Sequence, residues 1–289
     1  MSEFWKRLAI TVVGAPTVIW LVWLGGAPLA ILISVASALA AYEFYRLAIG
    51  SGSEPLWGHG VIFSAAIPLF AYARQLGLWV PNVTIVMTIV MLLILELLTV
   101  ALWVRGSQGK PLEVVSITLL GVCYTGGMMS FAFALRYHPY AIGAAAGTAL
   151  VALPFLLTWG TDIGGYVFGR LIGGRKLMPA VSPGKTVAGA LGGLVLAILI
   201  AVFYERYTLR PRAQLGMLPQ DAILVGILVS VAGQVGDLVE SMLKREAGVK
   251  DSSHLIPGHG GMLDRIDSLL FTLPVSYALL GWLLIPVPR

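Results

Sequence analysis

The chain has 289 residues, of which 58% are hydrophobic and only 11% charged, and its mean hydropathy is +0.88. These values exclude an ordinary soluble globular protein, and the net charge of +5 is too small and too dispersed to indicate a nucleic-acid partner. Apolar stretches of about 18 residues or more recur along the whole length, and each is long enough to cross a bilayer as a helix. Lipid accepts only elements that satisfy their own backbone hydrogen bonds, and these runs do not alternate apolar with polar residues. We therefore expect an all-α polytopic integral membrane protein.

The sequence predicts about nine transmembrane helices. They lie near residues 8–25, 27–45, 57–75, 79–104, 113–135, 141–168, 187–204, 219–240 and 267–287. The first has Lys6 and Arg7 before an apolar run, as a signal peptide does, but further apolar spans follow at once, so we expect an uncleaved helix. The sixth is long for one plain helix, and Pro154 with "TWGTDIGG" is expected to break or tilt it.

Lysine and arginine are distributed unevenly between the two sides of the membrane that nine spans define. The side with the N-terminus and the loops after even-numbered spans carries thirteen: Lys6, Arg7, Arg46, Arg105, Lys110, Arg170, Arg175, Lys176, Lys185, Lys244, Arg245, Lys250 and Arg265. The opposite side carries six: Arg74, Arg136, Arg206, Arg210, Arg212 and Arg289. Because cytoplasmic loops are enriched in basic residues, we expect a multi-pass protein of the inner cell membrane with the first side in the cytoplasm.

Polar residues concentrate in two segments on this cytoplasmic side, 158–193 and 233–267. The second holds eight charged residues between positions 241 and 267, within a chain that otherwise avoids charge. The single Cys123 lies inside the fifth span, which excludes an intrachain disulfide and a cysteine-based metal cluster. Any chemistry is therefore expected in these two polar segments.

Asp237 lies near the cytoplasmic end of the eighth span. An ionisable side chain at that depth usually faces a partner or a water-filled cavity. Asp237, Glu240, Ser241 and Lys244 follow the spacing i, i+3, i+4 and i+7, which places them on one helical face. A solvated charged helix end is the alternative explanation, and for Glu240 it stays open.

Asp264 and Asp267 lie one turn apart where the ninth helix begins. Either acid alone is explained by the helix dipole, which favours negative charge in a first turn. Both together beside Arg265, in a segment about to enter lipid, favour a functional site. Carboxylates at two helix ends suit Mg²⁺ that holds a polyphosphate, so Asp237 and Asp264 are the expected metal ligands.

The glycines of "IPGHGGM" suit an anion. Gly258, Gly260 and Gly261 allow positive φ angles and expose backbone N–H groups that can surround phosphate. His254 and His259 raise the alternative of zinc, which the missing cysteines and the missing HExxH pattern disfavour. His259 is expected instead to donate to a phosphate or a hydroxyl.

The sequence "SPGKT" resembles part of a P-loop. Pro179 stands where the first glycine of a P-loop would be, and the segment lies between membrane spans, so that reading fails. Ser182, Lys185 and Thr186 still form a basic, hydroxyl-rich turn before a helix N-terminus, which suits an anion. Asp162 is a further acid at membrane depth.

The segment from residue 241 to residue 267 resembles the signature of the phosphatidate cytidylyltransferases (CDP-diacylglycerol synthases). The matching positions are Ser241, Lys244, Arg245, Lys250, Asp251, Ser253, Ile256, Pro257, His259, Gly260, Gly261, Asp264, Arg265 and Asp267. The "SPGKT" loop, "DIGGYVFGRLIGG" and the number of spans agree as well, so the resemblance covers most of the chain. Ala188 departs from it, because relatives often have glutamate there, and any role of that glutamate does not carry over.

The resemblance implies transfer of cytidylate from CTP to phosphatidic acid in the bilayer, with release of pyrophosphate and with Mg²⁺ as cofactor; a second cation stays open. It implies one transmembrane domain, 1–289, in which 1–140 are N-terminal helices and 141–289 are catalytic helices and cytoplasmic loops, with the active site at the cytoplasmic ends of the C-terminal helices. The expected catalytic residues are Asp237, Lys244, Arg245, Asp264 and Asp267. The expected substrate-binding residues are Ser182, Lys185, Thr186, Ser241, Lys250, Asp251, His259, Gly260, Gly261 and Arg265.

Alternatives remain beside this expectation. A related enzyme that cytidylates another lipid phosphate stays open, and so does a homodimer. A transporter with the intramembrane carboxylates Asp162 and Asp237 is a rival of a different class, although its acids would lie nearer the bilayer midplane. CDP-alcohol phosphotransferases carry a clustered DG…AR…G…D…D array, which this sequence lacks.

Overall fold

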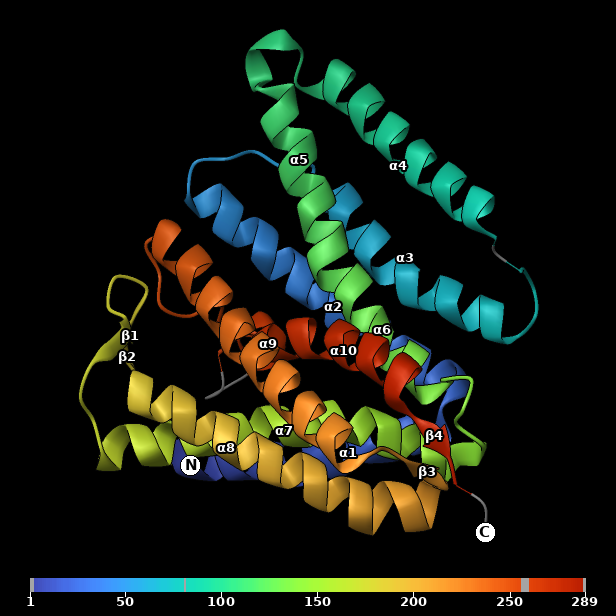
Figure 1. Cartoon of the computed structure of the whole chain (residues 1–289). Coiled ribbons are helices and arrows are strands. Elements are labelled where there is room, and N and C mark those ends of the chain that lie inside the picture. Colours follow the sequence, from blue (N-terminus) through green and yellow to red (C-terminus); the bar gives the residue numbers. More distant parts are fainter. Residues whose placement is uncertain (1–2, 81, 256–259, 288–289) are drawn as a thin grey trace.

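The computed structural model describes residues 3–80, 82–255 and 260–287, and most of them are helical (Figure 1). The helices are α1 Glu3–Leu24, α2 Gly26–Gly50, α3 Trp57–Gln75, α4 Val83–Val104, η1 Ser107–Gly109, α5 Pro111–Gly121, η2 Val122–Gly127, α6 Met128–Arg136, α7 Gly143–Leu171, α8 Val187–Tyr204, η3 Glu205–Ala213, α9 Pro219–Glu246 and α10 Leu263–Leu283. The strands form two antiparallel pairs, β1 Lys176–Met178 with β2 Ser182–Thr186, and β3 Leu215–Gly216 with β4 Ile285–Pro286.

Each of the nine predicted segments coincides with helical structure in the part of the chain that the structure describes. Seven helical stretches there are long and apolar enough to cross a membrane: Gly26–Gly50, Val83–Val104, Pro111–Arg136, Gly143–Leu171, Val187–Ala213, Pro219–Glu246 and Leu263–Leu283. α1 and α3 are not among these seven, and the apolar stretch found within α1 is Val12–Leu24. The all-α polytopic class follows from these helices, whereas nine crossings stay a prediction.

α7 differs from its expected form. It runs unbroken from Gly143 to Leu171 with Pro154 inside it, so the expected break near "TWGTDIGG" is wrong. A proline removes one backbone hydrogen bond, which packed neighbouring helices tolerate in a membrane protein. At 1.5 Å per residue the helix is about 44 Å long, so it either tilts within a hydrocarbon core of about 30 Å or projects from it. The interruption lies instead in the fifth segment, where the π-helical turn η2 joins α5 to α6.

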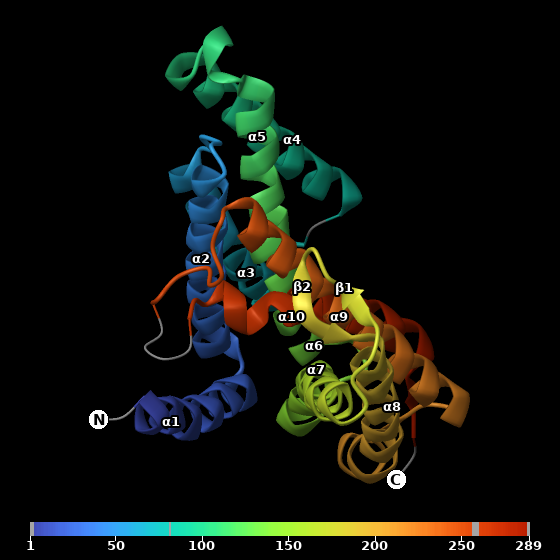
Figure 2. The same cartoon turned by 90° about the vertical axis from the view of Figure 1, so that its left-hand side faces the viewer.

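α7 and α8 lie side by side (Figures 1 and 2), and glycines make their close approach possible. A Cβ atom at Gly164 would lie 2.8 Å from the Cα of Gly193, and one at Gly189 would lie 2.6 Å from the carbonyl oxygen of Gly165. Larger residues at these positions would push the two helices apart. The β1–β2 hairpin that connects them projects beyond their paired ends and contacts α9.

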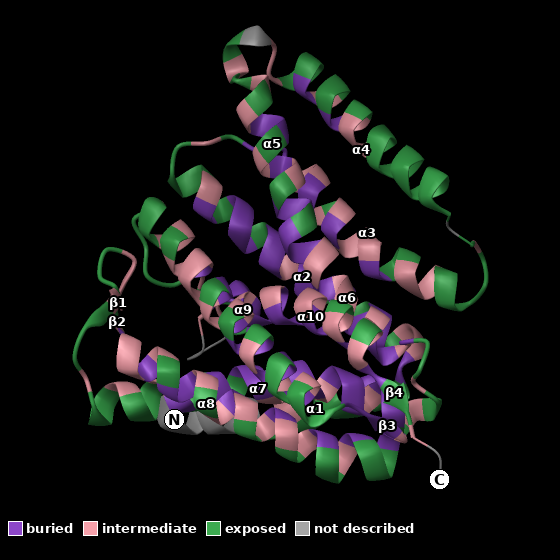
Figure 3. Ribbon diagram, in the orientation of Figure 1, coloured by how far each residue is buried: buried purple, intermediate pink, exposed green. Residues whose placement is uncertain are grey.

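Burial separates an inner group of helices from a peripheral one (Figure 3). The buried core draws on α2, α6, α7, α9 and α10, whereas α4 lies at the edge with most of its surface exposed. Most of the exposed side chains of α4 are apolar, Leu92, Leu95 and Trp103 among them. A surface of that kind suits contact with lipid, and the inner helices are left to hold the polar residues.

Candidate active site

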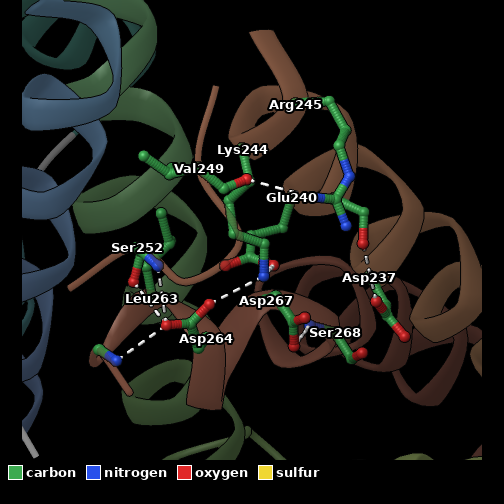
Figure 4. Close-up of polar contacts among 12 residues, drawn as sticks. Asp237, Glu240, Lys244, Arg245, Val249, Ser252, Leu263, Asp264, Asp267 and Ser268 are labelled. Atoms are coloured by element: carbon green, nitrogen blue, oxygen red, sulfur yellow. Dashed lines mark hydrogen bonds and ion pairs between the residues drawn. The ribbon is translucent and has the colours of Figure 1, made fainter. Parts of the chain in front are cut away.

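The cytoplasmic end predicted for α9 carries a polar face that meets the start of α10 (Figure 4). Ser241 Oγ donates to Asp237 Oδ1 over 3.4 Å, and Lys244 forms an ion pair with Glu240 one turn earlier. Glu240 has 0% of its surface exposed, so it does not belong to a solvated helix end. The helical spacing read from the sequence therefore produces a cluster inside the protein.

The two polar segments of the sequence meet at Asp237. Lys185 of β2 forms an ion pair with the Asp237 carboxylate, and these side chains are 29% and 31% exposed. Arg245 Nε also donates to the backbone carbonyl of Val181 over 3.3 Å, which is a second link between the hairpin and α9. Residues that are 52 positions apart in sequence thus share one site through this ion pair.

Asp264, in the first turn of α10, receives donors on both carboxylate oxygens. Oδ1 accepts from Lys244 Nζ over 2.8 Å. Oδ2 accepts from the N–H of Gly261 over 2.8 Å, and from the N–H and hydroxyl of Ser252 over 3.0 and 2.8 Å. The Glu240 carboxyl group also lies within hydrogen-bond reach of Asp264, whose side chain is 6% exposed, so the protein itself surrounds this carboxylate.

A pocket of about 530 Å³ lies between α7, α8, the β1–β2 hairpin and α9. Its polar lining includes Asp162, Tyr166, Arg170, Lys185, Gln234 and Asp237. Pockets of about 300–1,000 Å³ with a few convergent polar groups are typical of small-molecule sites. The ion pair of Lys185 with Asp237 therefore lies in the wall of a cavity that can hold a ligand of nucleotide size.

The acids around this pocket are suited to a hard cation. Asp162 and Asp267 both lie within electrostatic range of Asp237. No three Asp, Glu, His or Cys side chains converge closely enough to hold a metal ion by themselves, as far as the described residues go. Mg²⁺ does not need such a group, because one or two carboxylates usually hold it together with water and phosphate oxygens. Asp237, on the pocket wall and 31% exposed, fits that requirement. Asp264 is the right kind of ligand but is paired with Lys244, which a cation bound there would have to displace.

Four further predicted substrate-binding residues have defined positions in the local structure. Thr186 caps α8, its hydroxyl accepting from the N–H of Gly189 over 3.1 Å, and Ser182 begins β2. Gly260 has a φ of +78°, a conformation that residues with a side chain rarely adopt. Gly261 directs its N–H to Asp264, so this glycine segment donates to a carboxylate rather than to an open cavity.

Four of the other predicted residues lie at the surface. Arg245, Lys250, Asp251 and Arg265 are exposed. They are near Asp264 in the sequence, but the hydrogen bonds to its carboxylate among the described residues come from Lys244, Ser252 and Gly261. His259 lies outside the described residues, so its expected role as a donor stays a prediction.

Two acids in apolar helices belong to this region although they are absent from the expected site residues. Glu43 of α2 accepts hydrogen bonds from Ser252 and Ser253. Asp162 of α7 lines the pocket beside Asp237. The available signal was the same for both: a single carboxylate within an apolar span is costly unless it has a partner.

Helices that can cross a membrane, with two acids, a lysine and an arginine lining one pocket, define a polytopic membrane protein with a polar cavity. The chain belongs to the cytidylyltransferase family, whose model matches residues 5–283. This match confirms the resemblance that the signature segment predicted.

Relatives in this family carry a common name. The chain is 34% identical over 283 residues to the phosphatidate cytidylyltransferase of Bacillus subtilis (strain 168), covering 97% of this chain and 99% of that protein. It is 36% identical over 224 residues to the phosphatidate cytidylyltransferase of Staphylococcus haemolyticus (strain JCSC1435), covering 76% and 78% of the two chains. It is 32% identical over 260 residues to that of Staphylococcus aureus (strain COL), covering 89% and 91%.

Proposed function

We infer that this chain catalyses the reaction of a phosphatidate cytidylyltransferase, in which CTP and phosphatidate become CDP-diacylglycerol and pyrophosphate. The observation that carries this inference is the similarity to proteins of that name over nearly the whole chain, within one family. The apolar helices agree with a lipid substrate, because a membrane-embedded enzyme can receive phosphatidate without removing it from the bilayer.

This reaction requires little acid–base chemistry. The phosphate monoester of phosphatidate has a second pKa of about 6, so it is largely a dianion at neutral pH. One of its oxygens attacks the α-phosphorus of CTP, the bond from that phosphorus to the bridging oxygen of the β-phosphate breaks, and pyrophosphate leaves with the electron pair. The protein must therefore bring two polyanions together and neutralise charge on the leaving group.

Asp237 and Asp264 are the proposed ligands of Mg²⁺, which when bound supplies neutralisation of the triphosphate and of the leaving pyrophosphate. Lys185, in the pocket wall beside Asp237, is proposed to hold a phosphate oxygen of the substrates. Lys244 fixes the direction of the Asp264 carboxylate, because it contacts Glu240 and Asp264 at once. These residues thus position charged groups where they can neutralise the phosphates of the two substrates.

Lys185→Ala is expected to lower kcat and kcat/KM together by about tenfold or more, since loss of about 1.4 kcal/mol of transition-state stabilisation has that effect. A lysine that only binds lipid headgroups contributes about 1 kcal/mol to membrane attachment, and its removal would be nearly silent in detergent. Steady-state kinetics in detergent micelles, over substrate concentrations from well below KM to saturation, measure the difference. The matched control is Lys176→Ala, an exposed lysine in the other strand of the hairpin. Near-normal kinetics for Lys185→Ala would remove the hairpin from the site.

We propose that both polar segments face the cytoplasm, on the thirteen-to-six bias of basic residues. The exposed His254 offers a position for a reporter, as His254→Cys in a Cys123→Ala background. An impermeant thiol reagent should leave this cysteine unlabelled in intact cells and should label it after permeabilisation. Labelling from outside would place the site on the side that CTP does not reach.

The function is tested with the purified protein, labelled CTP, Mg²⁺ and a panel of lipid phosphates. We expect phosphatidate to be cytidylated with release of pyrophosphate. Turnover of a different lipid phosphate alone would indicate the related enzyme with another substrate. A folded protein that releases no pyrophosphate with any of them would favour the transporter alternative, for which Asp162 and Asp237 are the intramembrane acids.

A further inference from the structure

We propose that Glu43 of α2 is a positioning residue that fixes the start of α10 and thereby aims the Asp264 carboxylate. The proposal rests on the proposed function, because it assigns Glu43 to the site of that reaction. Glu43 belongs to the N-terminal helices 1–140, whereas the sequence places the catalytic residues within 141–289.

The Glu43 carboxylate is fully enclosed, with 0% of the residue exposed, and four donor groups lie within hydrogen-bond distance of it. Oε1 accepts from the Ser253 hydroxyl over 2.6 Å and from the N–H of Met262 over 3.0 Å. Oε2 accepts from the N–H of Leu263 over 2.6 Å and from the Ser252 hydroxyl over 3.1 Å. The Ser252 hydroxyl has a single proton, which it shares between Glu43 and Asp264, whereas the other three donors serve Glu43 alone. A carboxylate that is enclosed and held in this way is unsuited to bind metal or substrate, so its effect on the reaction must act through the residues that it holds.

α10 begins without a side-chain cap from its own N-terminal residue. Met262 stands at the N-cap position and makes no side-chain capping bond. The first N–H groups of a helix have no partners within the helix, and when buried they need an acceptor. Glu43 supplies that acceptor from α2, 219 and 220 residues earlier in the chain, and its negative charge lies at the positive end of the helix dipole. The first turn of α10 is therefore held by α2.

The same contacts extend to Asp264. The Ser252 hydroxyl lies between the two carboxylates, 3.1 Å from Glu43 Oε2 and 2.8 Å from Asp264 Oδ2. There is no spare room beside Glu43, since a Cβ atom at Gly261 would lie 2.5 Å from Oε2. Asp264 follows Leu263 directly within the helical turn, so a shift of that turn would move its carboxylate relative to Lys244. Misplacement of a reacting group by about 1 Å can cost on the order of a hundredfold in rate.

The test compares Glu43→Gln with Glu43→Asp in the full-length protein. Glutamine keeps the shape, but it offers one acceptor oxygen and turns an amide N–H₂ group toward donors. We expect Glu43→Gln to lower kcat per folded molecule by about tenfold or more, while KM for CTP changes by less than about threefold. Glu43→Asp, which keeps both acceptor oxygens and the charge, should recover part of the lost kcat. A purely structural role would reduce the amount of folded protein and leave kcat per folded molecule unchanged.

Glu54→Gln is the control, because Glu54 is an exposed acid that pairs with Arg105 away from this network. A kcat for folded Glu43→Gln within about twofold of wild type would overturn the proposal. If that variant does not fold, Ser252→Ala decides, since it removes the hydroxyl between the two carboxylates and leaves Glu43 in place. A loss of kcat of about threefold or more supports the proposal, and a smaller loss overturns it. An inactive wild-type protein would instead contradict the proposed function and this inference with it.

Discussion

Asp237→Asn is expected to lower turnover by about a thousandfold or more while the protein stays folded and inserted. The substitution removes a proposed Mg²⁺ ligand from the pocket wall and leaves the Lys185 cation without its carboxylate partner. A thousandfold loss corresponds to about 4 kcal/mol of transition-state stabilisation, which is in the range expected for losing a catalytic metal. The measurement is kcat in detergent at saturating CTP and phosphatidate, with the unfolding temperature recorded alongside.

The matched control is the same substitution at Asp221, an acid in the first turn of the same helix at its other end. Asp221→Asn should retain wild-type kcat, because it affects only the local helix dipole, which contributes about 0.3–1 kcal/mol to stability. More than about a tenth of wild-type turnover in Asp237→Asn would contradict the assignment of Asp237 as a ligand.

Asp264→Asn is expected to lower turnover by about a hundredfold or more and also to lower the unfolding temperature. Donors face both oxygens of Asp264, with Lys244 on Oδ1 and Ser252 and Gly261 on Oδ2. Asparagine in either orientation turns its N–H₂ group toward at least one donor, and an unsatisfied partly buried polar group costs about 1–3 kcal/mol. Kinetics and thermal unfolding of the same preparation test both effects.

Lys244→Met provides the second half of a double-mutant cycle for this contact. Because Lys244 and Asp264 share one ion pair, the double variant should lose less free energy of unfolding than the two single losses added together. If those losses were strictly additive, the proposed contact between Lys244 and Asp264 would be contradicted. Normal turnover together with a normal unfolding temperature in Asp264→Asn would contradict the role proposed for Asp264.

Local patterns were enough to predict much of the candidate site. Asp237 and Lys244 stand out because charge within an apolar helix is costly and because they share a helical face. Lys185 stands out because it lies in a basic, hydroxyl-rich turn before a helix. The predicted topology also assigns them to one side of the membrane, and the structure brings Lys185 and Asp237 into contact.

Contacts between distant segments could not be predicted in this way. Glu43 reads in sequence as one acid in an apolar helix, and nothing near it indicates that its partners lie at 252–263. The unbroken α7 is a second feature that depends on contacts between segments distant in sequence. Pro154 and the glycines that follow it are poor helix formers, and packing against α8 outweighs that propensity.

The chain joins CTP to phosphatidate, and the ratio of the two products formed provides a decisive test of this reaction. The purified wild-type protein with Mg²⁺, phosphatidate and CTP labelled in the cytidine should form CDP-diacylglycerol and pyrophosphate in equal amounts, and neither when one substrate is omitted. Release of pyrophosphate without phosphatidate, or no labelled lipid from a folded and inserted protein, would contradict the account.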